Sequence, residues 1–337
     1  MRKADLFAVE GNRVRCTACE RLCLLGEGQT GLCGIRKNIG GELYLISYGV
    51  ASALAIDPIE KKPLYHFHPG SRVLSISTTG CNWMCKYCQN YDISQRREVS
   101  GTPLTPEEVV RIALENKVDG ISYTYNEPTV FAEYAKDIGI LARKNGLFNT
   151  YVSNGYQSEV SVPYISSFLD AITVDFKGNA NAEFGKKYIG IRDFEPVLRN
   201  LLHLKKMGLY LEITDLVVPI PNIGDNVQDA RSLARWIFEN LGENTPLHFT
   251  RFHPDYHMMD VPPTPVETLR AHYKAAKEEG LKFVYIGNVP GDPLENTYCP
   301  RCGNPVIERY GFSIVKKQVD SEGRCKFCGE SLNIRYS

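Results

Sequence analysis

Three cysteines, Cys81, Cys85 and Cys88, lie close together in the stretch T-T-G-C-N-W-M-C-K-Y-C-Q-N. Thiolates bind zinc and iron–sulfur clusters, and a structural zinc ion and a cubane cluster each take four protein ligands. Three thiolates on a [4Fe–4S] cube would leave the fourth iron open to a small molecule, and an open position is typical of a catalytic site. The alternative is a zinc site completed by a remote histidine.

The other eight cysteines form two sets of four. These are Cys16, Cys19, Cys23 and Cys33 near the start of the chain, and Cys299, Cys302, Cys325 and Cys328 near its end. Short C-x2-C spacings without a recognisable secretion signal favour metal binding over disulfides. The 4+3+4 partition therefore predicts two complete metal sites and one incomplete one.

The C-terminal set reads C-P-R-C-G and, after a spacer, C-K-F-C-G, which predicts a zinc ribbon. The glycine after each pair suits the tight turn that brings main-chain N–H groups to the sulfur atoms. The surrounding sequence is locally basic, so a protein or nucleic-acid substrate docked through the ribbon is one hypothesis. A purely structural ribbon is the other. The basic residues are Arg301, Arg309, Lys316, Lys317, Arg324, Lys326 and Arg335.

The N-terminal set is spaced C-x2-C-x3-C-x9-C, which is looser than a zinc finger. Zinc is the favoured metal for this set, and an auxiliary iron–sulfur cluster that relays electrons is the alternative. The spacing alone does not decide between them.

The elements that must position these cysteines alternate between strand and helix. The sequence predicts strands at 72–78, 120–125, 148–153, 171–176, 210–218, 247–252 and 282–287, and helices at 105–116, 129–145, 195–207, 227–241 and 266–279. Such alternation predicts parallel strands joined by right-handed crossovers. The three-cysteine loop follows the first strand of this series, and in such barrels the chemistry lies at the carboxyl ends of the strands.

The predicted fold is α/β, a partial TIM-like (β/α) barrel rather than a doubly wound sheet. We expect three segments: a cysteine-rich segment at 1–70, the barrel core at 71–290 and the zinc ribbon at 291–337.

The composition excludes some classes of partner. The chain has 337 residues, 43% of them hydrophobic, and its 39 basic and 39 acidic residues cancel. No global charge directs it to nucleic acid or to anionic membranes. Met1–Glu10 lacks the apolar core of a signal peptide, and no apolar run is long enough to span a membrane. We expect a soluble, cytoplasmic protein.

The stretch C-N-W-M-C-K-Y-C-Q-N after a first strand resembles the signature of radical S-adenosylmethionine (SAM) enzymes. The resemblance implies a [4Fe–4S] cluster on Cys81, Cys85 and Cys88, with the amino and carboxylate groups of SAM on the open iron. It places Tyr87 near the adenine. One electron would cleave the sulfonium and yield methionine and a 5′-deoxyadenosyl radical, which abstracts a hydrogen atom from a substrate.

The ends of later strands extend the resemblance. Asn126 and Glu127 resemble the segment that binds the SAM ammonium, although Tyr125 and Asn126 stand where activases usually have glycines. The alternative for Glu127 is a carboxylate at a helix N-terminus. Asn154 resembles a polar position near the cofactor, and Thr214, Arg251 and His253 are further expected contacts. A lone histidine is more often structural.

The segment V-D-F-K-G resembles the D-x-K of glycyl-radical activases. Asp175 and Lys177 are two apart on a predicted strand and so share a face. The resemblance implies a catalytic role, whereas the alternative is a mutual ion pair of little energetic value.

Nearly the whole chain resembles one branch, the radical SAM enzyme of the AmmeMemoRadiSam system, which is related to pyruvate formate-lyase activating enzymes. The supporting segments include C-T-A-C-E-R-L-C, D-P-I-E-K-K-P-L-Y-H-F-H-P-G-S and Y-N-E-P-T. The substrate stays open: a glycine of a partner protein, a nucleobase in RNA, or a small molecule. The electron would come from a one-electron reductase or a ferredoxin-type donor. The alternative of a different class is a non-catalytic metal-binding scaffold, for which an incomplete cluster has no use.

Overall fold

The computed structural model describes residues 1–336 and divides into two compact units. Unit 1 contains Met1–Asp57, Arg72–Ile172 and Glu195–Leu209, and unit 2 contains Pro58–Ser71, Thr173–Phe194 and Tyr210–Ser337. The three-cysteine loop and the N-terminal cysteines belong to unit 1. The C-terminal cysteines share unit 2 with several barrel strands. The proposed boundaries at 70 and 290 therefore stay a prediction about sequence segments.

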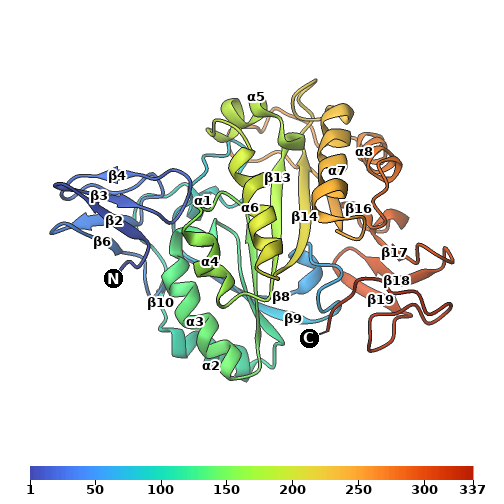
Figure 1. The fold of residues 1–337 in the computed structure, drawn as a ribbon, viewed down its shortest axis with the longest axis horizontal. Helices are drawn as coiled ribbons and strands as arrows, with labels where there is room; N and C mark the ends of the chain where they lie inside the picture. Colours follow the sequence, from blue (N-terminus) through green and yellow to red (C-terminus); the bar gives the residue numbers. More distant parts are fainter. Residues whose placement is uncertain (337) are drawn as a thin grey trace. The chain divides into compact units, whose positions relative to one another are not determined.

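Within residues 1–336 the largest sheet has eight strands in the order β16-β15-β14-β13-β12-β11-β9-β8. Their bounds are β8 Ala53–Pro58, β9 Arg72–Ser77, β11 Gly120–Tyr123, β12 Phe148–Ser153, β13 Ala171–Lys177, β14 Tyr210–Val217, β15 Leu247–Arg251 and β16 Val284–Gly287. In unit 1, β9, β11 and β12 pair in parallel, and in unit 2 so do β14, β15 and β16. The predicted α/β fold with a partial barrel is confirmed (Figure 1).

All seven predicted strands are present, with β12 at its predicted bounds. Strand β8 was not predicted, because its sequence A-L-A-I-D-P has no alternation of apolar and polar residues. The 3-10 helix η2 Pro128–Phe131 directly precedes α3. The α-helices are α1 Tyr91–Ser94, α2 Pro106–Glu115, α3 Ala132–Lys144, α4 Ser161–Ser166, α5 Ala182–Phe184, α6 Glu195–Lys206, α7 Val227–Leu241 and α8 Val266–Glu278.

Local chemistry explains where α2 begins. Thr105 accepts a hydrogen bond from the Glu108 N–H, the Glu108 carboxylate accepts one from the Thr105 N–H, and Pro106 is the first helical residue. This capping box satisfies two main-chain donors that an uncapped helix would leave without partners.

The N-terminal segment of unit 1 is built from short antiparallel strands in the orders β1-β6-β5 and β2-β3-β4. They are β1 Arg2–Lys3, β2 Phe7–Glu10, β3 Arg13–Cys16, β4 Leu24–Leu25, β5 Arg36–Ile39 and β6 Glu42–Leu45. Arg36 forms a buried ion pair with Glu133 of α3, and Glu133 also accepts the Asp5 N–H. The segment is thereby attached to the helix layer of its own unit.

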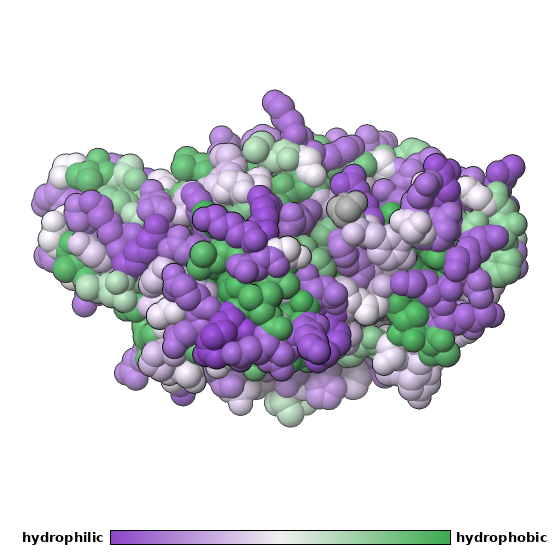
Figure 2. Space-filling model, turned by 90° about the horizontal axis from the view of Figure 1, so that it is seen from below, coloured by the Kyte–Doolittle hydropathy of each residue, from purple (hydrophilic) through white to green (hydrophobic). Residues whose placement is uncertain are grey.

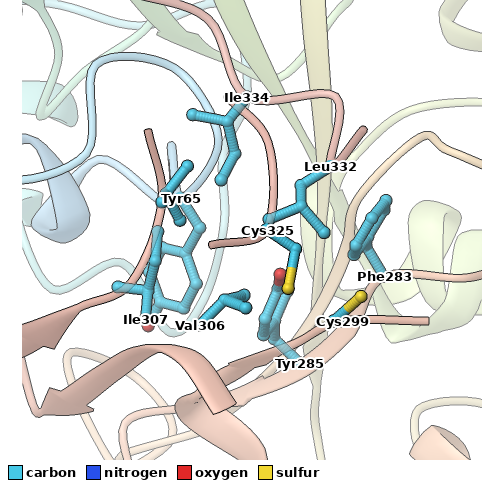
Figure 3. Close-up of a cluster of buried hydrophobic side chains, with 10 residues drawn as sticks. Tyr65, Phe283, Tyr285, Cys299, Val306, Ile307, Cys325, Leu332 and Ile334 are labelled. Atoms are coloured by element: carbon cyan, nitrogen blue, oxygen red, sulfur yellow. The ribbon is translucent and has the colours of Figure 1, made fainter. Parts of the chain in front are cut away.

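The C-terminal sheet of unit 2 has the order β17-β18-β19, with β17 Thr297–Tyr298, β18 Pro305–Tyr310 and β19 Ser313–Lys317. Figure 3 shows its core, in which side chains of the cysteine knuckles and of β18 pack with Tyr65 and with Phe283 and Tyr285 beside and on β16. In the same unit Glu212 accepts hydrogen bonds from the Tyr65 and His66 N–H groups and pairs with His248. Glu212 therefore has a structural role inside this unit.

No helix among residues 1–336 is both long and apolar enough to cross a membrane. The face drawn in Figure 2 is largely hydrophilic, with separate apolar areas.

Candidate functional site

The three-cysteine loop begins at the carboxyl end of β9 and is held there by Asn126. The buried Asn126 amide donates to the main-chain oxygens of Thr78 (2.7 Å) and Gly80 (2.6 Å). Asn126 directly follows the turn after β11, so the end of one strand fixes the loop that leaves its neighbour. The Oδ1 atom of Asn126 is buried and makes no hydrogen bond within the described residues. An acceptor without a partner at this place fits a ligand with an N–H donor.

Gly80 brings the loop against the N-terminal segment. Its φ of +90° is left-handed, and a Cβ atom there would lie 2.2 Å from the Cys33 carbonyl oxygen. The Gly80 N–H donates to Ile93 O at 2.9 Å. Only glycine allows this conformation and this approach of two main chains.

The three thiols after Gly80 converge without forming a disulfide. Burial raises the pKa of the Cys81 thiol, a hydrogen bond from the Trp83 N–H opposes the rise, and the neighbouring Cys85 and Cys88 add to it. The Cys88 sulfur lies 3.0 Å from Ser94 Oγ. Within residues 1–336 these three sulfurs are not among the atoms close enough to share a single ion. The donor set fits a cluster in which each cysteine binds a different iron, and bound metal would replace the thiol protons.

Glu127 lies beside this loop and is fully buried. Its carboxylate accepts hydrogen bonds from Thr129 N (3.0 Å), Ser153 Oγ (2.9 Å) and Asn154 N (2.7 Å). Burial raises its pKa, and these hydrogen bonds oppose the rise. The carboxylate caps η2, as one of the two sequence interpretations expected. Its role toward the SAM ammonium stays a prediction.

Asn154 connects the end of β12 to the cysteine loop. Its Nδ2 donates to Asn82 Oδ1 at 2.8 Å, and the main-chain oxygen of Asn82 accepts from Arg21 Nε at 2.9 Å. The structure thus brings Asn126, Glu127 and Asn154 together around one loop. Sequence reasoning missed the two partners, Asn82 and Ser153, although each is adjacent to a residue it had selected. Tyr87 is buried in the same loop, and its contact with adenine stays a prediction.

Asp175 and Lys177 lie at the end of β13 in unit 2. Lys177 Nζ donates to Asp175 Oδ2 at 2.6 Å, and the side chains are only 17% (Lys177) and 24% (Asp175) exposed. The two residues therefore form the ion pair that the alternative interpretation described. Their catalytic role stays a prediction.

The other expected contacts in unit 2 have the following surroundings. Thr214 Oγ1 lies 3.2 Å from Thr173 Oγ1, and Arg251 Nε donates to Thr264 O at 2.8 Å. His253 is 71% exposed and lies 3.1 Å from Asp255. Each of the three thus has a partner from its own unit, and their contact with a cofactor stays a prediction.

Asp215 is an ionisable residue of β14 that the sequence analysis did not select. It is fully buried, and its Oδ1 accepts from Asn179 N at 3.0 Å. Burial raises its pKa to about 7, and the Asn179 hydrogen bond and the Lys177 charge only partly offset this effect. In the sequence, Asp215 could have been selected because it directly follows Thr214 and so lies on the opposite face of the same strand.

The C-terminal cysteines form a compact four-sulfur group. All four sulfurs lie within 4.8 Å of one another, with Cys299 and Cys328 at 3.5 Å and Cys302 and Cys325 at 3.8 Å. These separations match the edges, roughly 3.8 Å long, of a tetrahedron with Zn–S bonds of about 2.3 Å. The predicted metal-binding group is confirmed, and the fold around it fits a zinc ribbon.

Comparison with known proteins relates the part of the chain that holds the three-cysteine loop to a protein family. Residues 75–237 match the radical SAM superfamily. The chain is 47% identical over 339 aligned positions to the uncharacterized protein MJ0808 of Methanocaldococcus jannaschii, covering 99% of both chains.

Among solved structures, Streptococcus suis SuiB bound to S-adenosylmethionine has a TM-score of 0.50 and 12% identity, with 72% of this chain and 56% of SuiB covered. A domain of a pyruvate-formate lyase-activating enzyme from Bacteroides vulgatus has a TM-score of 0.43 and 12% identity, with 50% of this chain and 99% of that one covered. These low identities concern the fold alone. The family match begins within β9 and includes the cysteine loop, Asn126, Glu127 and Asn154. Residues 75–237 of this chain therefore belong to the radical SAM superfamily.

Proposed function

We propose that this protein binds a [4Fe–4S] cluster on Cys81, Cys85 and Cys88 and cleaves SAM reductively to a 5′-deoxyadenosyl radical that abstracts hydrogen from a substrate. The single observation that carries the proposal is the loop with three thiols at the carboxyl end of β9, whose start is held in place by hydrogen bonds from Asn126. A bound cluster supplies one electron and an iron position for the methionine end of SAM.

The residues of the chain have separate tasks in this proposal. Asn126 and Gly80 hold the loop, and the Asn126 Oδ1 atom is available to an N–H donor. Glu127 keeps Ser153 and the Asn154 main chain in place. Asn154 orients Asn82, which lies between the first two cysteines of the loop.

The C-terminal ribbon of unit 2 has a proposed metal and a proposed role in substrate binding. Zinc is the metal we propose for the four-sulfur group of the ribbon. The ribbon also exposes Tyr310, Phe312, Val315 and Phe327 near its basic residues. Exposed aromatic and basic side chains together suit a macromolecular substrate, which favours a protein or RNA over a small molecule.

A ferredoxin-type protein is the proposed electron donor. We place the chain in the AmmeMemoRadiSam branch, and the more specific function that we propose is that of an activase acting on a glycine of a partner protein.

The decisive experiment is anaerobic reconstitution with iron and sulfide, followed by addition of dithionite and SAM and chromatography of the products. We expect 5′-deoxyadenosine and methionine in equal amounts. Cys85→Ala should lower the yield at least a hundredfold, whereas Met84→Ala, at the exposed neighbouring position, should leave it within about twofold of the native yield. Background yield from protein with a spectroscopically complete cluster would favour the non-catalytic scaffold.

A further inference from the structure

The N-terminal cysteines Cys16, Cys19, Cys23 and Cys33 form a second converging set of sulfurs in unit 1. Cys16, Cys19 and Cys33 are buried, Cys23 is half-buried, and none is in a disulfide. The main chain folds them together, because Cys16 N–H donates to Cys23 O at 2.9 Å and Leu22 N–H to Cys19 O at 3.0 Å. Thiolate charges on the four residues would interact with one another.

Main-chain donors are directed at these sulfurs. The N–H groups of Ala18, Arg21 and Ile35 donate to the sulfurs of Cys16, Cys19 and Cys33, each from two residues further along. The Arg36 guanidinium adds a buried positive charge near Cys16 and Cys33. Both features would stabilise the negative charge of metal-bound thiolates, against the burial that favours the neutral thiols.

The spacing of the sulfurs separates this set from the ribbon. Within residues 1–336 the ribbon cysteines are the only His, Cys, Asp or Glu group whose ligand atoms come close enough to share one ion. The N-terminal sulfurs converge without reaching that closeness, as do those of Cys81, Cys85 and Cys88. In a cluster each cysteine binds a different iron, so its sulfurs lie farther apart than four ligands of a single zinc ion.

The position of the set is equally specific. The Cys33 carbonyl lies against Gly80, and Arg21, between Cys19 and Cys23, donates to Asn82. The residues before and after Cys81 are therefore both in contact with the N-terminal cysteine segment. A one-electron carrier for a cluster on Cys81 would be well placed in this segment.

We propose that Cys16, Cys19, Cys23 and Cys33 bind an iron–sulfur cluster of the cubane type, rather than the zinc ion that the sequence spacing favoured. The site stands on its own geometry and does not require SAM cleavage. Four cysteine ligands would leave no iron open, which suits a carrier of single electrons rather than a site of substrate binding.

The test is a chain in which Cys81, Cys85 and Cys88 are all changed to alanine, so that the N-terminal set is intact. After anaerobic reconstitution with ferrous iron and sulfide, we expect equal amounts of iron and sulfide, about four of each per chain, and about one zinc. Reduction by dithionite should produce the paramagnetic signal of a reduced cluster. Adding Cys16→Ser and Cys19→Ser to this variant should remove the iron and leave the zinc.

The native chain provides an independent measurement in case the variant misfolds. It should bind about eight irons, four for each cluster. Iron below about one per chain in a folded triple variant, or only about four irons in the native chain, would overturn the proposal. Neither readout depends on turnover, so its failure is distinguishable from failure of the proposed function.

Discussion

The Asn126 side chain donates a hydrogen bond of 2.6 Å to the main-chain oxygen of Gly80, directly before Cys81. A second bond, of 2.7 Å, reaches Thr78 O. One amide at the end of β11 thus sets the path of the chain into the cysteine loop. The position of the three thiols depends on a contact between residues 46 positions apart in the chain.

Replacing Asn126 with alanine should therefore loosen the loop. Two buried carbonyl oxygens would lose this donor, at a cost of about 2–4 kcal/mol in the free energy of unfolding. Urea unfolding of the metal-free protein measures this loss of stability. The iron content after reconstitution measures whether the loop can still bind a cluster. Asn116→Ala is the control, because Asn116 is exposed and donates to one helix carbonyl. Equal losses in the two variants would contradict the role of Asn126.

Gly80→Ala should disrupt both cysteine segments of unit 1. The added Cβ would lie 2.2 Å from Cys33 O in a left-handed conformation, so we expect a loss of about 3 kcal/mol or more. Gly146→Ala is the matched control, since Gly146 has φ +77° and no atom within 4 Å of an added Cβ. It should cost only about 1 kcal/mol, for the backbone strain. Thermal unfolding compares them, and similar losses would show that Cys33 can move away.

Removing metal from the ribbon should unfold its local core. Cys299 and Cys325 pack among apolar residues such as Val306 and Leu332, so the metal site and the apolar core share the same side chains (Figure 3). Because metal binding supplies much of the folding energy of such a site, Cys325→Ser should release zinc and lower the stability by several kcal/mol. Zinc analysis and calorimetry test this, with the exposed Ser313→Ala as the control. A variant without zinc that melts like the native chain would refute it.

Asp215 should make the stability depend on pH. Burial raises its pKa in the folded chain to about 7, above the ordinary value of 3.8, so between these values the folded state binds the extra proton. This contribution to stability is fully present below about pH 4 and is lost as the pH rises to 7, by about 4 kcal/mol at most. Asp215→Asn should remove this slope.

The measurement is the unfolding free energy of the native chain, Asp215→Asn and the exposed control Asp260→Asn at several pH values from 4.5 to 7.5. The difference between native chain and Asp215→Asn should change steadily with pH, in favour of the variant at the higher values. A constant difference would mean that Asp215 ionises normally in the folded protein.

Local sequence signals were sufficient for most of the fold. Strand β12 and helix α7 begin and end where the pattern predicted, because apolar periodicity, capping residues and glycines act within a few positions of one another. The eighth strand, β8, was missed because its residues lack that periodicity and form a strand through pairing with the sheet.

The cysteines follow the same division. Their number and spacing alone predicted three sulfur sites, one of them a ligand short, because a thiol reaches only a few ångströms from its main chain. The tertiary structure decided the partners of Asn126, the enclosure of Glu127 and Asp215, and the separation of the N-terminal sulfurs. Each of these depends on side chains brought together from distant positions, and burial and hydrogen bonding act on the distance in space rather than on the distance along the chain.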